Sequence, residues 1–182
     1  MQPALIRPRP AARSDAARPH SGVSVRPFGR CAGSVRPVQP LSTAAIRRPF
    51  HWGIVIVSAP EEGGAIPDVQ PGLAVTGDEH GLIALVRHAQ DVESFAEEFD
   101  WAEAEVLVRL LLDEAPESAD RREVYRGRLH TPSGRVTVGD ADSEVTHPAH
   151  DGWTNVVVTV DADVPGDDLS PDAIRVDLSP GE

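Results

Sequence analysis

Apolar and polar residues alternate over much of the chain after residue 53, and a period of two residues is typical of β-strands with one buried face. The segment 102–112 gives the clearest example. Its alternate positions are all apolar: Ala102, Ala104, Val106, Val108, Leu110 and Leu112. A helix through Leu107, Leu110 and Leu111 is the alternative, because Glu, Ala and Leu favour helices. The unbroken alternation favours the strand.

Three other segments carry a strand signal. The β-branched residues 54–57 predict a strand over 53–58. In the segments 154–163 and 173–179, alternate residues again share an apolar face. These residues are Val156, Val158, Val160, Ile174, Val176 and Leu178.

Two hairpins are predicted from turn residues. The first joins strands 72–77 and 82–89 through the sequence GDEHG. The second lies within 123–141, where two alternating runs flank a Pro-Ser-Gly turn at 132–134.

Short strands joined by turns of Gly, Pro and Asp indicate an all-β domain. We predict an antiparallel β-sandwich of about 7–8 short strands. At most one short helix is expected, over residues 91–99, where Asp91 could cap it and Phe95 and Phe99 are four residues apart.

The first 50 residues differ from the rest of the chain. They contain nine Arg, eight Pro and a single acidic residue, Asp15. Such a segment buries too little apolar surface to offset the entropy of ordering it. We therefore expect a disordered Arg/Pro/Ala-rich tail over residues 1–50 and an acidic folded domain over residues 51–182.

Three interpretations of this tail remain open. It could be a basic interaction arm, or an organellar transit peptide, which is also rich in Arg. The favoured interpretation is a start codon assigned too far upstream in a GC-rich reading frame. A high-GC source also explains why all 17 basic residues are Arg.

Arg47 and Arg48, followed by Phe50 and the apolar run 52–57, partly match a twin-arginine export signal. The run is short and Gly53 interrupts it, so the segment is better explained as the first strand of the domain. We expect a cytoplasmic protein, with export as the minor alternative.

The charge of the domain limits its partners. Residues 51–182 contain eight Arg and 28 acidic residues, so phosphates would be repelled and nucleic acid is not expected to bind. No apolar run reaches the roughly 18 residues of a membrane span. A single cysteine, Cys31, excludes an internal disulfide. Adaptation to salt is a further explanation of the acidity.

Carboxylates and imidazoles concentrate in one stretch near the C-terminus. They are Asp140, Asp142, Glu144, His147, His150 and Asp151. Oxygen ligands suit Ca²⁺ or Mg²⁺, and His with carboxylate suits Zn or Fe. The alternative is an ordinary acidic loop, because Pro148 interrupts any helix that would aim both imidazoles at one ion. We expect no cofactor, and a divalent metal is the alternative.

Five of the eight Arg residues of the domain lie within 15 residues of one another. They are Arg121, Arg122, Arg126, Arg128 and Arg135. On the predicted hairpin, Arg126 and Arg128 share a face and Arg135 lies opposite. This strip would bind an acidic partner or pair with the domain's own carboxylates, and internal pairing is favoured.

The sequence contains neither a G-x-S-x-G nucleophile motif nor a Gly-rich phosphate loop. We therefore expect a small non-catalytic protein-interaction module that binds an unknown protein. The alternative is a metal-binding protein or a metal-dependent enzyme that uses residues 140–151.

Overall fold

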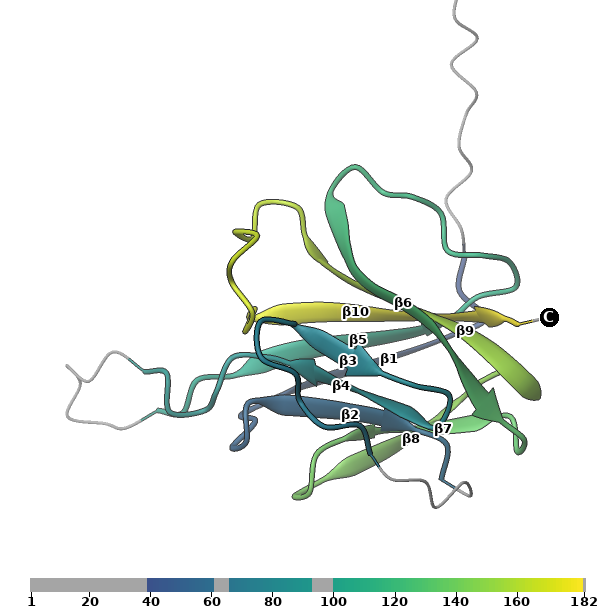
Figure 1. Ribbon diagram of the computed structural model, residues 1–182, viewed down its shortest axis with the longest axis horizontal. Coiled ribbons are helices and arrows are strands. Elements are labelled where there is room, and N and C mark those ends of the chain that lie inside the picture. Colours follow the sequence, from purple (N-terminus) through teal and green to yellow (C-terminus); the bar gives the residue numbers. More distant parts are fainter. Residues whose placement is uncertain (1–38, 61–65, 93–99, 182) are drawn as a thin grey trace, which may run out of the picture. The chain divides into compact units, whose positions relative to one another are not determined.

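The computed structural model describes residues 39–60, 66–92 and 100–181, and within these ranges the chain forms strands and turns without a helix. These described ranges therefore contain no helix that could span a membrane. Ten strands form two five-stranded sheets (Figure 1). The strands are β1 (Ser42–Arg48), β2 (Ile54–Ser58), β3 (Val75–Gly77), β4 (Gly81–Leu85), β5 (Ala104–Leu110), β6 (Arg121–Thr131), β7 (Arg135–Gly139), β8 (Glu144–Pro148), β9 (Gly152–Asp161) and β10 (Ala173–Pro180).

Each sheet contains strands that are distant in sequence. Sheet A has the order β1-β5-β10-β9-β6, and sheet B has the order β3-β4-β2-β7-β8. All neighbouring strands are antiparallel except β5 and β10, which are parallel. The all-β class is therefore confirmed, with ten strands where about 7–8 were expected.

The two sheets bury one shared apolar core. Val108, Val158 and Val176 of sheet A belong to the same buried cluster as Val57 and Val138 of sheet B. Branched side chains at alternate positions fill the space between two pleated sheets, which is the arrangement of a sandwich.

The alternating segments form strands as predicted. β5 spans most of the segment 102–112, and its buried and accessible residues alternate, so the helix alternative is wrong. The apolar faces expected for β9 and β10 also lie in the core. The short helix expected over 91–99 falls mostly outside the described residues.

The first predicted hairpin is confirmed. Val75 of β3 pairs with Ala84 of β4. Asp78 organises the turn, because its Oδ1 accepts hydrogen bonds from the amides of His80 and Gly81 at 2.8 and 3.1 Å.

The second predicted hairpin is wrong. β6 pairs with β9 in sheet A, whereas β7 pairs with β2 and β8 in sheet B. The turn at 132–134 therefore carries the chain from one sheet to the other. Gly134, with φ of 64°, permits a tight turn but does not determine which sheet receives the next strand.

The expected domain boundary at residue 50 is wrong as well, because β1 lies before it. β1 pairs with β5 along its whole length, from Ser42 opposite Leu110 to Arg48 opposite Ala104. The prediction missed β1 because Ile46 is its one large apolar residue. Residues 1–38 are outside the described ranges, so disorder there stays a prediction.

A buried ion pair fastens β1 to sheet B. Arg48 Nη2 donates to Asp140 Oδ1 at 2.7 Å and to the carbonyl of Ser143 at 2.9 Å. The Asp140 side chain is 0% exposed. The guanidinium also lies over the ring of Phe50, 4.4 Å from its centroid. At the other end of β1, Ser42 Oγ lies 3.3 Å from His147 Nε2 of β8.

The opposite side of the sandwich is closed by β6 and the β3–β4 hairpin. The amide of His130 donates to the carbonyl of Glu79 at 2.8 Å. Tyr125 of β6 lies against Gly77, where a Cβ atom would stand 2.5 Å from the phenol oxygen. Glycine is thus required at position 77 for this close approach.

We predict that Arg48→Met lowers the free energy of unfolding by about 3 kcal/mol, because it leaves the buried Asp140 carboxylate without its partner. Arg47→Met is the matched control. Arg47 pairs with Glu103 at the surface, where the two side chains are 70% and 46% exposed. Its loss should cost less than about 1 kcal/mol. Urea denaturation measures both free energies of unfolding. Equal losses of stability in the two variants would contradict a special role for the Arg48–Asp140 pair.

We also predict that the Arg48–Asp140 pair makes stability depend on pH. Burial raises the pKa of Asp140, but hydrogen bonds from Arg48 and from the amides of Asp142 and Ser143 outweigh it, so the pKa is lower than normal. The stabilisation is complete above the pKa of about 3.9 in the unfolded chain and is lost as pH falls through the folded-state pKa.

The difference in unfolding free energy between the natural protein and Asp140→Asn should therefore shrink below about pH 4. Denaturation of both proteins between pH 7 and pH 2 tests this. A difference that stays constant over the whole range would contradict it.

Candidate functional site

The three carboxylates expected on one strand face are separated by a turn. β7 ends at Gly139 and β8 begins at Glu144, so the alternation of Asp140, Asp142 and Glu144 does not continue through a strand. Asp140 is buried against Arg48, whereas Asp142 and Glu144 are exposed.

The two imidazoles of the same stretch have separate partners. His147 is buried, with Nδ1 2.8 Å from the carbonyl oxygen of Pro148, and burial lowers its pKa. His150 Nε2 lies 2.8 Å from the carbonyl oxygen of Leu111. Asp151 is exposed. Across the described ranges, no three side chains of His, Cys, Asp or Glu come together as a metal site requires.

The five arginines do not form one strip. Arg135 lies on β7 of sheet B, and the other four lie on β6 of sheet A. Arg128 lies over the ring of Trp153, 5.2 Å from its centroid. The arrangement expected from a hairpin is therefore absent.

Three arginines of β6 are paired inside the domain. Arg121 forms an ion pair with Asp161, and Arg126 donates to Glu123 and to Glu114, both at 2.6 Å. Arg122 donates to the carbonyls of residues 164 and 165. These contacts agree with internal pairing, the favoured interpretation of the sequence.

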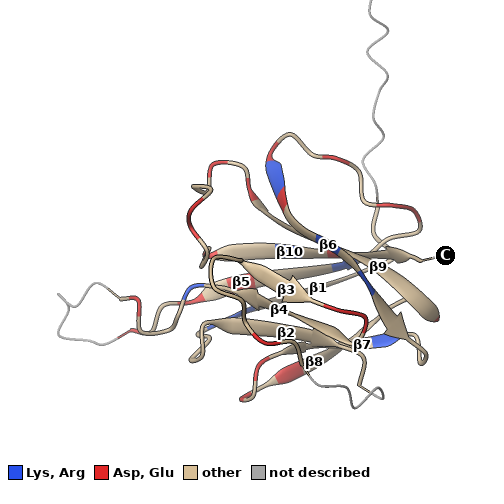
Figure 2. Cartoon of the chain, in the orientation of Figure 1, with Lys and Arg blue, Asp and Glu red and all other residues tan. Residues whose placement is uncertain are grey.

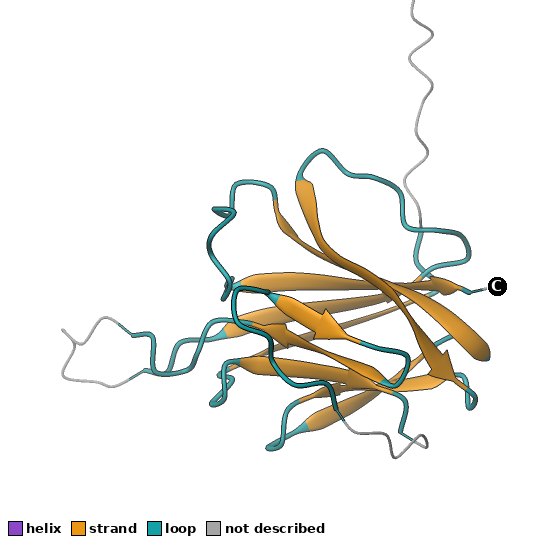
Figure 3. Ribbon diagram, viewed as in Figure 1, coloured by secondary structure: helices purple, strands orange, loops and turns teal. Residues whose placement is uncertain are grey.

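The sequence did not single out the loops at one end of the sandwich. Because Arg48 lies opposite Ala104, the β1–β2 turn at 49–53 is adjacent to the segment 100–103 that leads into β5 (Figure 3). Trp52 and Trp101 occupy these two segments and are 64% and 41% exposed. The ring of His51 meets that of Trp101 edge-on, with centroids 5.1 Å apart.

The turn that carries Trp52 is held by its backbone. The carbonyl of Phe50, whose side chain is fully buried, accepts hydrogen bonds from the amides of Gly53 and Ala89, both at 3.0 Å. The amide of Ala102 donates in turn to the carbonyl of Ala89 at 2.9 Å. Gly53 has φ of 61°, which other residues rarely adopt. The two tryptophans therefore stand on connected, well-anchored segments.

A groove of about 830 Å³ lies beside Trp101. Its lining carries two guanidiniums and four carboxylates, from Arg47, Arg87, Asp100, Glu103, Glu105 and Asp172. Arg47 pairs with Glu103 at 2.9 Å and Arg87 with Asp172 at 3.2 Å. The rim consequently has an excess of negative charge, and Figure 2 shows other acidic residues on the loops of the domain.

We call this end of the molecule, from Trp52 and Trp101 to the groove, the tryptophan end. Exposed aromatic rings beside charged side chains are suited to recognition and supply no catalytic group by themselves. The sequence places both tryptophans next to strands, where the local pattern does not determine whether a large ring faces the core or solvent.

No protein-family model and no curated protein matches the chain. Two solved structures are similar to it. One is ComJ from Bacillus subtilis, described as an inhibitor of the DNA-degrading activity of NucA, with 12% identity, a TM-score of 0.50, and coverage of 79% of this chain and 98% of that chain. The other is described as crocagin biosynthetic gene J, with 13% identity, a TM-score of 0.44, and coverage of 78% and 98%. At these identities the similarity to ComJ concerns the fold alone.

Proposed function

We propose that this protein is a non-catalytic binding module that attaches to another protein through the tryptophan end and thereby inhibits that protein. The observation that carries the proposal is the exposure of Trp52 and Trp101 on two adjacent segments at one end of the sandwich. The chain has only three tryptophans, and these two are exposed at one end of the domain.

Tryptophan is enriched among the residues that dominate protein–protein binding energies, because it buries a large apolar area and keeps one polar N–H group. Burial of one such ring contributes several kcal/mol at about 25 cal/mol per Å² of apolar surface. The anchored backbone of residues 49–53 reduces the entropy that would be lost on binding.

The charge of the rim indicates the kind of partner. Four carboxylates against two guanidiniums around the groove, on a chain of net charge −12, favour a partner with a basic surface. Enzymes that act on nucleic acid present such surfaces to phosphates. An acidic module bound to such a basic surface would compete with the nucleic acid that the enzyme acts on. The fold shared with ComJ supports an inhibitory role of this kind.

Site-specific photo-crosslinking in the source cells tests the proposal. A photoreactive phenylalanine analogue at position 52 or 101 should capture one discrete protein. The same analogue at Leu112 or Val145 is the matched control, since these apolar residues are 61% and 41% exposed elsewhere on the domain. Leu112 follows β5, whereas Trp101 precedes it.

The captured partner then allows a binding measurement. Trp52→Ala should weaken its affinity by about 10- to 100-fold, and Leu112→Ala by less than about twofold. The association rate should fall as salt increases. Equal crosslinking at the control positions, or unchanged affinity of Trp52→Ala, would overturn the proposal.

A further inference from the structure

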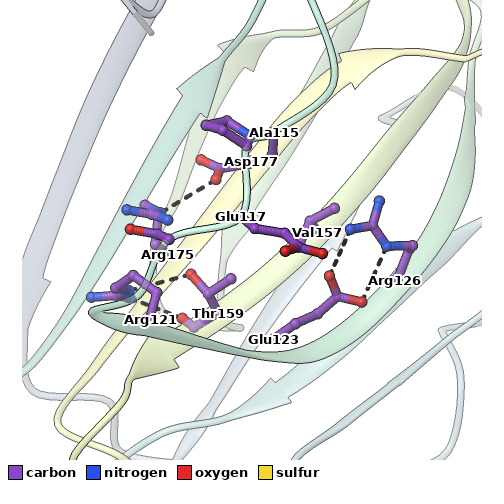
Figure 4. Close-up of a pocket in the computed structure, with 11 residues that line it drawn as sticks. Ala115, Glu117, Arg121, Glu123, Arg126, Val157, Thr159, Arg175 and Asp177 are labelled. Atoms are coloured by element: carbon purple, nitrogen blue, oxygen red, sulfur yellow. Dashed lines mark hydrogen bonds and ion pairs between the residues drawn. The ribbon is translucent and has the colours of Figure 1, made fainter. Parts of the chain in front are cut away.

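A second cavity lies on the outer face of sheet A, under the connection between β5 and β6 (Figure 4). Its volume is about 280 Å³. Residues 115–118 of the connection form one wall, and β6, β9 and β10 form the others. Val157 provides an apolar patch among charged side chains.

The buried carboxylate of Asp177 lies between two arginines in this cavity. Arg109 of β5 donates to both of its oxygens, at 2.7 and 2.8 Å. Arg175 Nε is 3.3 Å from Asp177 Oδ2. Within the described ranges this buried nitrogen has no hydrogen-bond partner. A buried donor without an acceptor is unfavourable, and the Arg175 guanidinium, which lines the cavity, makes no hydrogen bond within the described ranges beyond its ion pair with Asp177.

The neighbouring arginines are already satisfied. Arg121 donates to the carbonyl of Thr159 at 2.9 Å and pairs with Asp161. Arg126 is held by two carboxylates, as described above. Arg109 and Arg175 share the single carboxylate of Asp177, and Arg109 takes both of its oxygens. Burial lowers the pKa of Arg175 against the effect of Asp177, and repulsion from Arg109 and Arg121 adds to the shift.

We propose that this cavity binds the carboxylate group of a small monoanion, which accepts hydrogen bonds from Arg175. An arginine presents its N–H groups in a planar fork that fits a carboxylate. Glu117 and Glu123 also line the cavity and oppose more than one negative charge, which disfavours phosphate. The volume suits a ligand smaller than a drug-sized molecule.

Titration of the full chain with sodium acetate at constant ionic strength tests this inference by thermal unfolding and by NMR. Acetate should raise Tm by about 2–4 °C near saturation. Arg175→Gln should abolish the response while Asp177 keeps its bonds to Arg109. Arg122→Gln is the control of equal charge, because Arg122 contacts backbone carbonyls outside the cavity.

Inorganic phosphate and two short peptides complete the experiment. A peptide with a free C-terminal carboxylate that binds better than acetate, while its amidated form does not bind, would identify a protein chain as the source of the carboxylate. Acetate binding without peptide binding would identify a free acid. Tighter binding of phosphate, an unchanged response in Arg175→Gln, or no response to acetate would overturn the proposal.

Discussion

The buried ion pair between Arg48 and Asp140 is the constraint on which the rest of the structure depends. β1 has little apolar surface of its own, and this pair joins it to the opposite sheet. Arg48 also lies over the ring of Phe50. The carbonyl of Phe50 in turn accepts the hydrogen bond from Gly53 that closes the β1–β2 turn. The buried charge pair and the turn that carries Trp52 are thus linked through Phe50.

Pairing of charged side chains inside the domain also decides which charges are available for binding. Most arginines of the described domain are held by its own carboxylates or carbonyls, as at Arg121 and Arg126, so they contribute to the scaffold. Two places differ. The groove at the tryptophan end has more carboxylates than guanidiniums, and Arg175 has a buried donor without an acceptor among the described residues. Both proposed binding sites therefore lie where the internal pairing of charges is incomplete.

The sequence predicted what local alternation determines: the all-β class, the strand β5 and the buried faces of β9 and β10. It did not predict β1, because Ile46 is the one large apolar residue of this strand and the partner of Arg48 is 92 residues away in the chain. It also could not assign β6 and β7 to different sheets, since a turn motif does not specify distant strand partners. The exposure of Trp52 and Trp101 depends likewise on how separate loops meet at one end of the sandwich.

Hydrogen exchange of the full chain, alone and bound to its partner protein, tests the central claim most directly. The account predicts added protection of backbone amides over residues 50–53 and 100–103, with no change around Leu112 or along β8. Protection confined to the outer face of β6, with none at the tryptophan end, would contradict it.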